Sequence, residues 1–404
     1  MKNFIVGQSG GPTTAINSSL AGVIKRALTS EKIETVYGMV NGIEGFLNEN
    51  IVTLERFNDD DKLRLLRQTP SSFLGSCRKK LPEIAEDEDT YKKIFSLFEK
   101  YNIGYFAYIG GNDSMDTVKK LSTYAKANGI DVKIAGIPKT IDNDLALTDH
   151  TPGFGSAAKY IANSIRELAM DTGVYKMKSI VVTEVMGRNA GWLTAAAALA
   201  NDEKVAPVDI ILLPEAVFDR EKFIEKVKKV MSKKDSTIIA VSEGIKDKDG
   251  NYIGESAPSL MQDGFAHANL GGVGKIIEDI IKKEIGIKTR SIEFSTMQRC
   301  AAKNLSLCDY EEAFNVGYEG ADYALMGNTG FMAAYERVSE NPYKSKIVFN
   351  NVDEIANLER KVPEDMITED KMNVTQKFID YAKPLIKGEP DIIYKDGVID
   401  FEIL

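Results

Sequence analysis

The sequence of 404 residues has little histidine and little cysteine, and it lacks an excess of positive charge. With only His150 and His267, and with Cys77, Cys300 and Cys308, there is little material for a catalytic histidine triad or a zinc site of histidine and cysteine. Three cysteines do not make a disulfide framework, and they indicate a reducing compartment. The net charge of −9 argues against a protein that binds nucleic acid or anionic membranes.

Long apolar runs are absent as well. The most apolar stretch, residues 192–200, is far shorter than the roughly 20 residues of a membrane span. Residues 1–7 show no positive segment followed by a long apolar one. We therefore expect a cytoplasmic protein without a membrane anchor. The apolar fraction of 43% and the charged fraction of 27% are ordinary for a globular chain.

What the sequence does have is a repeated order of short apolar run, turn and amphipathic helix. Strands are predicted at residues 3–7, 104–109, 132–137, 180–184, 209–213, 237–241 and 289–294, and helices from about residue 14 and at 114–128, 190–200, 220–231 and 272–284. The alternation predicts an α/β protein with two doubly wound, Rossmann-like α/β/α domains and the active site in the cleft between them. Residues 343–404 are expected to be a C-terminal extension that packs on the domains.

Four loops follow predicted strands directly, at residues 7–12, 110–114, 138–144 and 186–188. Because such sheets bind ligands outside the carboxyl ends of their strands, the loops should converge on one crevice or on facing crevices. The glycine pairs of the first two loops allow backbone N–H groups near a helix start to approach an anion. A tight turn before a helix explains the same glycines without a ligand.

The strongest motif is residues 138–144, with the sequence PKTIDND. One carboxylate of the Asp142 and Asp144 pair can accept a hydroxyl proton, and the other can orient the acceptor or bind Mg²⁺, which prefers oxygen ligands. Lys139 supplies positive charge for phosphate oxygens. A polar surface turn would explain the Asn-Asp end of the motif, but it does not require a Lys-Thr pair after a buried strand. The motif therefore favours phosphoryl transfer.

Further charged side chains lie near predicted strand ends. Arg188 can bind a phosphate through two N–H groups or pair with a neighbouring carboxylate. Glu243 can accept hydrogen bonds from sugar hydroxyls or cap a helix. Arg290 and Arg299 lie around another strand end, and Arg78 begins a run of three cations. Such a run is also typical of a solvated face.

These motifs, in this order, resemble the phosphofructokinase family over residues 3 to about 334. The resemblance rests on residues 138–144 above all, and on 75–78 (GSCR), 110–114 (GGNDS), 186–188 (MGR), 242–243 (SE) and 298–299 (QR). It implies transfer of a phosphoryl group to the 1-hydroxyl of fructose 6-phosphate, a step of glycolysis and gluconeogenesis. We expect a donor domain of residues 1–145, joined by residues from about 296 to 342, and a sugar-phosphate domain of residues 146–295.

The resemblance implies a role for each matching residue. Asp142 would take the proton from the hydroxyl, and Thr140 and Arg78 would contact the transferred group. Asp144 would orient the reacting groups or serve the metal. The donor site is expected to contain Gly10, Gly11, Arg78, Asp113, Ser114 and Lys139. The sugar-phosphate site is expected to contain Thr140, Asp142, Met186, Gly187, Arg188, Glu243, Arg290, Gln298, Arg299 and Lys178.

Two positions bear on the phosphoryl donor. In members of the family that use ATP, the positions of Asp113 and Lys139 are both glycine. The Asp113 carboxylate would fill the space of the nucleotide beyond its β-phosphate and repel the α-phosphate. The Lys139 ammonium also fills space, but it can bind the far phosphate of a shorter donor. The pair therefore resembles the pyrophosphate-dependent members.

Some positions depart from the family pattern. Asn112 stands where many members have an acidic residue linked to the metal, which leaves Asp113 or Asp144 as the expected ligand of Mg²⁺. Lys178 is displaced by one residue from a sugar-site cation of the family. In the family, cations at the positions of Lys178 and Arg290 reach into a neighbouring subunit's site. The resemblance therefore implies a homo-oligomer, a dimer or a tetramer.

We predict reversible, Mg²⁺-dependent phosphoryl transfer from pyrophosphate to fructose 6-phosphate, which gives fructose 1,6-bisphosphate and phosphate. An ATP-dependent phosphofructokinase is one alternative, and Asp113 with Lys139 argues against it. A non-catalytic regulatory subunit of the same fold is another, but such a chain would be expected to lose Asp142. The sequence leaves open the physiological direction, the allosteric effector and whether sedoheptulose 7-phosphate is also accepted.

Overall fold

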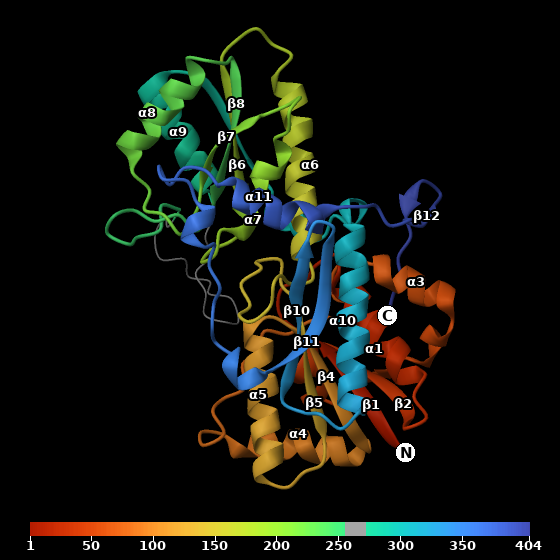
Figure 1. Cartoon of the computed structure of the whole chain (residues 1–404). Coiled ribbons are helices and arrows are strands. Elements are labelled where there is room, and N and C mark those ends of the chain that lie inside the picture. The colour runs from red at the N-terminus through yellow and green to blue at the C-terminus, as the bar shows by residue number, and fades with distance from the viewer. Residues whose placement is uncertain (255–271) are drawn as a thin grey trace.

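The computed structural model describes residues 1–254 and 272–404. Figure 1 shows two lobes, one above the other, each built around a sheet of mainly parallel strands. The larger sheet has the strand order β11-β10-β5-β4-β1-β2-β3, and the smaller sheet has the order β7-β8-β6-β9. In the larger sheet only the two edge strands, β3 and β11, run antiparallel to their neighbours.

The larger sheet consists of β1 (Lys2–Gln8), β2 (Ile33–Met39), β3 (Ile51–Thr53), β4 (Ile103–Gly110), β5 (Lys133–Pro138), β10 (Phe331–Glu340) and β11 (Tyr343–Asn351). The smaller sheet consists of β6 (Ser179–Val185), β7 (Val208–Leu212), β8 (Ser236–Ser242) and β9 (Lys288–Glu293). The helices are α1 (Ile16–Leu28), α2 (Gly42–Leu47), α3 (Asp60–Gln68), α4 (Glu88–Lys100), α5 (Asn112–Ala127), α6 (Phe154–Thr172), α7 (Trp192–Ala195), α8 (Arg220–Met231), α9 (Val273–Ile285), α10 (Leu307–Leu325) and α11 (Gln376–Ala382). A hairpin of β12 (Tyr394–Lys395) and β13 (Val398–Ile399) lies near the end of the chain.

Helices cover both faces of the larger sheet. Along β1, Phe4 and Val6 pack in one core with α1 and α10, whereas Ile5 packs in another core with α4 and α5. Successive side chains of a strand point to opposite faces, so a strand that is apolar at every position is buried on both sides. This is the doubly wound arrangement that the alternating pattern predicts.

The smaller sheet is covered in the same way. Ile180 and Val182 of β6 pack with α8 and α9, and Val181 and Val185 pack with α6 on the other face. All strands of this sheet run parallel. The predicted fold class, with two Rossmann-like units, is confirmed.

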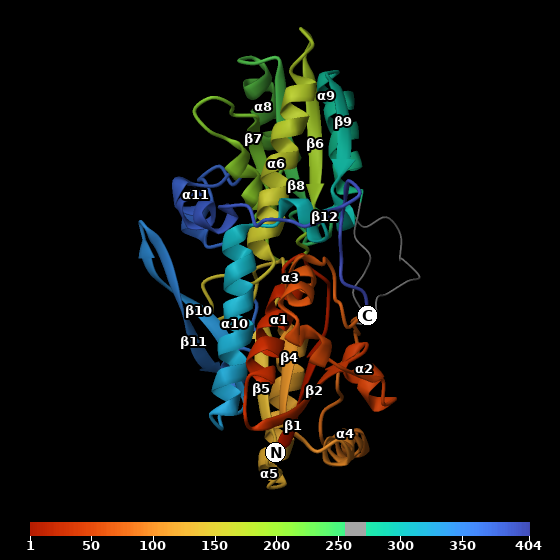
Figure 2. The same ribbon diagram turned by 90° about the vertical axis from the view of Figure 1, so that its right-hand side faces the viewer.

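Four segments of the described chain connect the lobes. Residues 139–153 lead from β5 into α6, and residues after β9 lead back to α10, which packs on α1. After β11, residues 362–385 pack in the core that contains α6 and Trp192. Figure 2 shows the chain continuing from α11 towards β12 and ending near α3, where the Gln68 amide donates to the carbonyls of Ile393 and Asp400. The expected C-terminal extension therefore begins with an edge strand of the larger sheet, and the division into domains stays a prediction.

One predicted element differs from the structure. Residues 190–200 were expected to form one alanine-rich helix, but α7 has four residues and is followed by a 3₁₀ helix at Ala196–Ala200. Alanine favours a regular helix, but Ala195–Ala198 are buried against α6 and neighbouring elements. Here tertiary packing overrides intrinsic propensity. Among residues 1–254 and 272–404, none of the helices combines the length and hydropathy needed to span a bilayer.

Candidate active site

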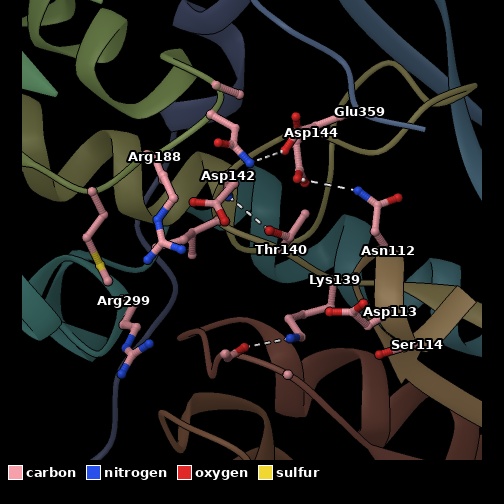
Figure 3. A pocket seen from close by; sticks show the side chains of 18 of the residues that line it. Asn112, Asp113, Ser114, Lys139, Thr140, Asp142, Asp144, Arg188, Arg299 and Glu359 are labelled. Atoms are coloured by element: carbon pink, nitrogen blue, oxygen red, sulfur yellow. Dashed lines mark hydrogen bonds between the residues drawn. The ribbon is translucent and has the colours of Figure 1, made fainter. Parts of the chain in front are cut away.

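A cavity of about 480 Å³ lies at the carboxyl ends of the strands, between the two lobes. It is lined by the four loops that the strand pattern predicts to converge, at residues 10–12, 111–114, 139–142 with 144, and 186–190. Arg78, Glu243, Arg299 and the later segment Asn357–Glu359 complete the wall. Figure 3 shows the acidic and basic side chains facing one another across this space. The loops therefore meet at one cavity.

Lys139 ties two of these loops together. Its side chain is only 2% exposed, and its Nζ donates to the carbonyl oxygens of Ser9, at 2.9 Å, and Gly11, at 2.5 Å. Its backbone N–H donates to Gly110 O at 2.9 Å. Burial lowers the pKa of the Lys139 ammonium to about 7, although the Asp142 carboxylate partly opposes the shift.

Two further cations lie on the same side of the cavity. Arg299 Nη1 lies 3.6 Å from the position that a Cβ on Gly11 would occupy. Burial and the neighbouring Arg78 lower the pKa of Arg299, and both arginines also lower that of Lys139. Three cations at one glycine-rich loop suit a polyanion. The role of Arg299 at the sugar 6-phosphate stays a prediction, because its guanidinium lies beside the donor loop here.

The first turn of α5 forms the opposite wall of the donor side. Asp113 Oδ1 forms a salt bridge with Lys80 Nζ at 2.8 Å. Ser114 is buried, and its Oγ would lie 1.8 Å from a Cβ on Gly110. Only glycine fits at position 110, because any larger side chain would clash with Ser114 where β4 and α5 approach each other. This close packing explains the glycine at the predicted tight turn.

The two carboxylates of the central motif lie close to one another at the middle of the cavity (Figure 3). Thr140 Oγ1 accepts the backbone N–H of Asp142 at 3.1 Å, and Asp144 Oδ2 accepts from Asn112 Nδ2 at 3.4 Å. Burial raises the pKa of Asp142, and Glu359 adds to the shift while Lys139 opposes it. Burial, Asp142 and Glu359 raise the pKa of Asp144. Carboxylates with raised proton affinity suit general base chemistry.

The smaller lobe supplies the loop after β6. Ser242 Oγ donates to Gly187 O at 2.6 Å, and the Gly187 N–H donates to Glu243 Oε1 at 3.2 Å. Burial raises the pKa of Glu243 to about 7, although the bond from Gly187 opposes the shift. Gln298 is buried, and its Oε1 accepts the Met186 N–H at 3.3 Å. Gln298 therefore supports the loop from behind and does not line the cavity.

Two predicted sugar-site cations are not brought to this cavity. Lys178 lies just before β6, at the strand end opposite to the cavity, and its Nζ donates to Met231 O at 2.6 Å. Arg290 lines a separate recess together with Tyr175. Within one chain, neither residue reaches the candidate site, because Lys178 precedes β6 and Arg290 lies near the start of β9, away from the carboxyl ends. Their contact with a neighbouring subunit stays a prediction.

Asn357–Glu359 also line the cavity, although no sequence motif predicts them there. Asn189 Nδ2 donates to Glu359 Oε1 at 2.9 Å, so this segment bridges to the loop of the smaller lobe. A backbone bridge joins Leu145 to Glu359, beside the central motif. The local sequence around Glu359 is ordinary charged chain and carries no motif.

Asp113 and Asp144 both line the cavity, and their role as ligands of a magnesium ion stays a prediction. Both side chains offer oxygen, and the neighbouring Asn112 Oδ1 is buried with no hydrogen-bond partner among the described residues. No cluster of three or more histidine, cysteine, aspartate or glutamate side chains suited to a metal ion occurs in the described part of the chain. Mg²⁺ commonly uses one or two protein carboxylates together with substrate phosphates and water, so the prediction does not require a larger cluster.

Two doubly wound lobes, with paired carboxylates and a cluster of cations in the cleft between them, form the arrangement of a phosphotransferase. The family model described as phosphofructokinase matches residues 3–361. A pyrophosphate–fructose 6-phosphate 1-phosphotransferase of Methylococcus capsulatus is 40% identical, over 100% of this chain and 96% of its own length. A pyrophosphate–fructose 6-phosphate 1-phosphotransferase of Xanthomonas campestris is also 40% identical, over 98% of this chain and 94% of its own length.

A solved structure gives the same result. The crystal structure of a pyrophosphate-dependent phosphofructokinase from Nitrosospira multiformis matches with a TM-score of 0.90 and 37% identity, over 99% of this chain and 96% of that one. The chain belongs to the phosphofructokinase family. The resemblance stated from the motifs is therefore confirmed.

Proposed function

We propose that the protein catalyses reversible phosphoryl transfer from pyrophosphate to the 1-hydroxyl of fructose 6-phosphate, giving fructose 1,6-bisphosphate and phosphate. The observation that carries this proposal is the buried Lys139 ammonium bonded to the donor loop, opposite the Asp113 carboxylate. The names of the relatives that match nearly the whole chain support it.

The donor is the first part of the proposal. The buried Lys139 side chain lines the donor side of the cavity, and its ammonium lies beside Gly11. Asp113, paired with Lys80, holds a carboxylate at the start of α5. A nucleotide would have to place its α-phosphate and sugar against these two side chains. Pyrophosphate is shorter and ends where the Lys139 ammonium can bind it.

The chemistry follows from the positions of the central side chains. Asp142, with its raised proton affinity, accepts the proton of the acceptor hydroxyl. Lys139, Arg78 and Arg299 neutralise charge on the phosphate oxygens during direct in-line transfer. When bound, Mg²⁺ would supply further positive charge to these oxygens, and Asp113, Asp144 and the oxygen of Asn112 are the side chains that would hold it.

The acceptor is assigned to the loop after β6. Glu243 lines the cavity beside Met186 and Gly187, and its carboxylate can accept hydrogen bonds from sugar hydroxyls. Arg188 lines the cavity and offers a guanidinium to the sugar phosphate. Fructose 6-phosphate would then lie between this loop and Asp142, with its 1-hydroxyl towards the donor side.

Compartment and assembly complete the proposal. We place the protein in the cytoplasm, and its three free cysteines suit a reducing compartment. We also propose that it forms a homo-oligomer, a dimer or a tetramer. The exposed Arg290 beside Lys288, remote from the cavity of its own chain, supports this part of the proposal. Sedimentation of the purified protein measures the assembly directly.

The experiment that tests the function measures formation of fructose 1,6-bisphosphate from fructose 6-phosphate and Mg²⁺, with pyrophosphate and ATP supplied in parallel. We expect turnover with pyrophosphate and little with ATP. Turnover with ATP alone would leave the fold and the sugar site but contradict the donor assignment. No product with either donor would favour a regulatory subunit or a different acceptor.

A further inference from the structure

The turn that carries the two central carboxylates has an unusual residue at its middle. Asn143 lies between Asp142 and Asp144, is completely buried and has a left-handed backbone with φ of 56°. Asparagine tolerates this conformation better than most residues, but it still needs support from its surroundings. With Asn143 in this conformation, the side chains on both sides of it line the cavity.

Locally, the Thr151 N–H donates to Asn143 Oδ1 at 3.0 Å, and the remaining support comes from the C-terminal part of the chain. Asn143 O accepts from Arg360 Nη2 at 2.9 Å and from Arg360 Nε at 3.3 Å. Asn143 Nδ2 donates to the hydroxyl of Tyr381 at 2.8 Å. Arg360 and Tyr381 lie 217 and 238 residues further along the chain than Asn143.

Arg360 bonds to the whole stretch that follows the carboxylates. Its Nη1 donates to the carbonyl oxygens of Thr148 at 2.8 Å and Asp149 at 2.6 Å. Its backbone N–H donates to Asp144 O at 2.7 Å. The guanidinium carbon lies over the Trp192 ring, 4.6 Å from its centroid.

Tyr381 reaches the same stretch from a second direction. Its hydroxyl donates to Asp149 O at 2.7 Å while it accepts from Asn143. The side chain is 9% exposed and packs beside Trp192 in the core of the smaller lobe. Neither Arg360 nor Tyr381 lines the cavity, so neither contacts a ligand there.

We propose that Arg360 and Tyr381 form a C-terminal clamp that positions Asp142 and Asp144 for catalysis by holding Asn143 from behind. Both are positioning residues, because they act through the backbone and side chain of Asn143. The inference rests on the proposed function, since its main readout is the rate of phosphoryl transfer.

The clamp should affect the rate more than the binding of substrates. A base displaced by about 1 Å from its productive position loses about 10²-fold in rate. The donor loop and the loop after β6 have side-chain supports of their own in Lys139, Ser242 and Gln298. We therefore expect kcat to fall by about 10- to 100-fold when the clamp is broken, with KM for both substrates changed less than about threefold.

The variants are Arg360→Lys and Tyr381→Phe. Lysine keeps the charge but cannot present the several N–H groups that bond Asn143, Thr148 and Asp149 together. Phenylalanine keeps the ring but removes the hydroxyl that joins Asn143 to Asp149. The matched control is Arg166→Lys, because Arg166 Nη1 also donates to a backbone carbonyl, that of Ala200 at 3.0 Å, but away from the turn.

Two measurements decide the inference. The first is kcat and KM with pyrophosphate and fructose 6-phosphate for the full-length protein and each variant. The second is amide hydrogen exchange of residues 140–151, compared with residues 186–191 in the same samples. We expect both clamp variants to lose rate and to exchange faster only in residues 140–151, with Arg166→Lys unchanged.

The outcomes separate this inference from the proposed function. If the unmodified protein is active and the clamp variants match Arg166→Lys in kcat, the clamp is refuted and the proposed function stands. If the unmodified protein is inactive with both donors, the proposed function fails. The exchange of residues 140–151 then decides the clamp, and unchanged exchange in both variants refutes it. If Arg360→Lys does not fold, Tyr381→Phe supplies the same comparison.

Discussion

Replacing Lys139 with methionine should selectively weaken the binding of pyrophosphate. Methionine keeps an unbranched apolar side chain in the buried space but removes the ammonium that lies against Ser9 O and Gly11 O. A hydrogen bond to a charged group contributes about 1.5–3 kcal/mol. We therefore expect KM for pyrophosphate to rise about 10- to 150-fold, while KM for fructose 6-phosphate stays nearly the same.

The same residue should give pyrophosphate binding a pH dependence of known sign. Burial lowers the pKa of Lys139 to about 7 in the protein without ligand. Raising the pH above this value removes the proton, and with it the charge that attracts a phosphate. The unmodified enzyme should therefore lose affinity for pyrophosphate above neutral pH more steeply than Lys139→Met, in which only the titration of pyrophosphate itself remains.

Steady-state rates at several pyrophosphate concentrations and pH values test this reasoning. Lys79→Met is the matched control, because Lys79 is an exposed cation beside Arg78 that does not line the cavity. An unchanged KM for pyrophosphate in Lys139→Met would refute the donor assignment. An equal rise in Lys79→Met would show a general effect of positive charge and not a contact of Lys139.

Three further predictions concern the base, the metal and a buried cluster. Asp142→Ser should lower kcat about 10²–10⁴-fold, and a loss below about tenfold in initial rates would remove Asp142 from the role of base. Chelation of divalent cations should abolish product formation, and added Mg²⁺ should restore it; full activity in excess chelator would contradict the metal assignment. Burial alone would lower the pKa of His150, but Glu312 and Asp149, at 2.8 and 2.9 Å, raise it to about 9. Protonated His150 therefore stabilises the folded protein fully below its unfolded pKa of about 6.5, and this contribution to stability is lost as pH rises through about 9. Chemical denaturation at several pH values measures this contribution. Across this range the free energy of unfolding of the unmodified protein should fall by about 3 kcal/mol more than that of His150→Asn. Equal falls in the two proteins would contradict the prediction.

The arrangement of the four loops could be predicted because each is a local unit. A strand, a glycine-rich turn and the start of a helix are neighbours in the chain, and parallel strands bring their carboxyl ends to one edge. Gly10, Lys139 and Gly187 line one cavity for this reason. The alanine-rich stretch at 190–200 shows the limit of local reasoning. Its propensity favours one helix, but packing against α6 leaves α7 and a 3₁₀ helix.

The positions of single cations were harder to predict. The strand pattern puts Lys178 before one predicted strand and Arg290 at the start of another, away from the carboxyl ends. Their place in the sugar-phosphate site was implied by the family resemblance alone. The structure places both away from the cavity of their own chain. Arg299 does line the cavity, but its guanidinium lies beside Gly11 on the donor side.

The sequence by itself determined the family, the two doubly wound units and the central motif, because these depend on short patterns of apolar residues, glycines and charges. Only the tertiary structure decided that Glu359 faces the two carboxylates and that Arg360 and Tyr381 hold the turn between them. These residues lie more than 200 positions from Asn143, and nothing in their local sequence indicates a site. Their contacts exist because the C-terminal chain packs on the core of the smaller lobe and returns to the cleft, and such long-range packing is fixed only when the whole chain folds.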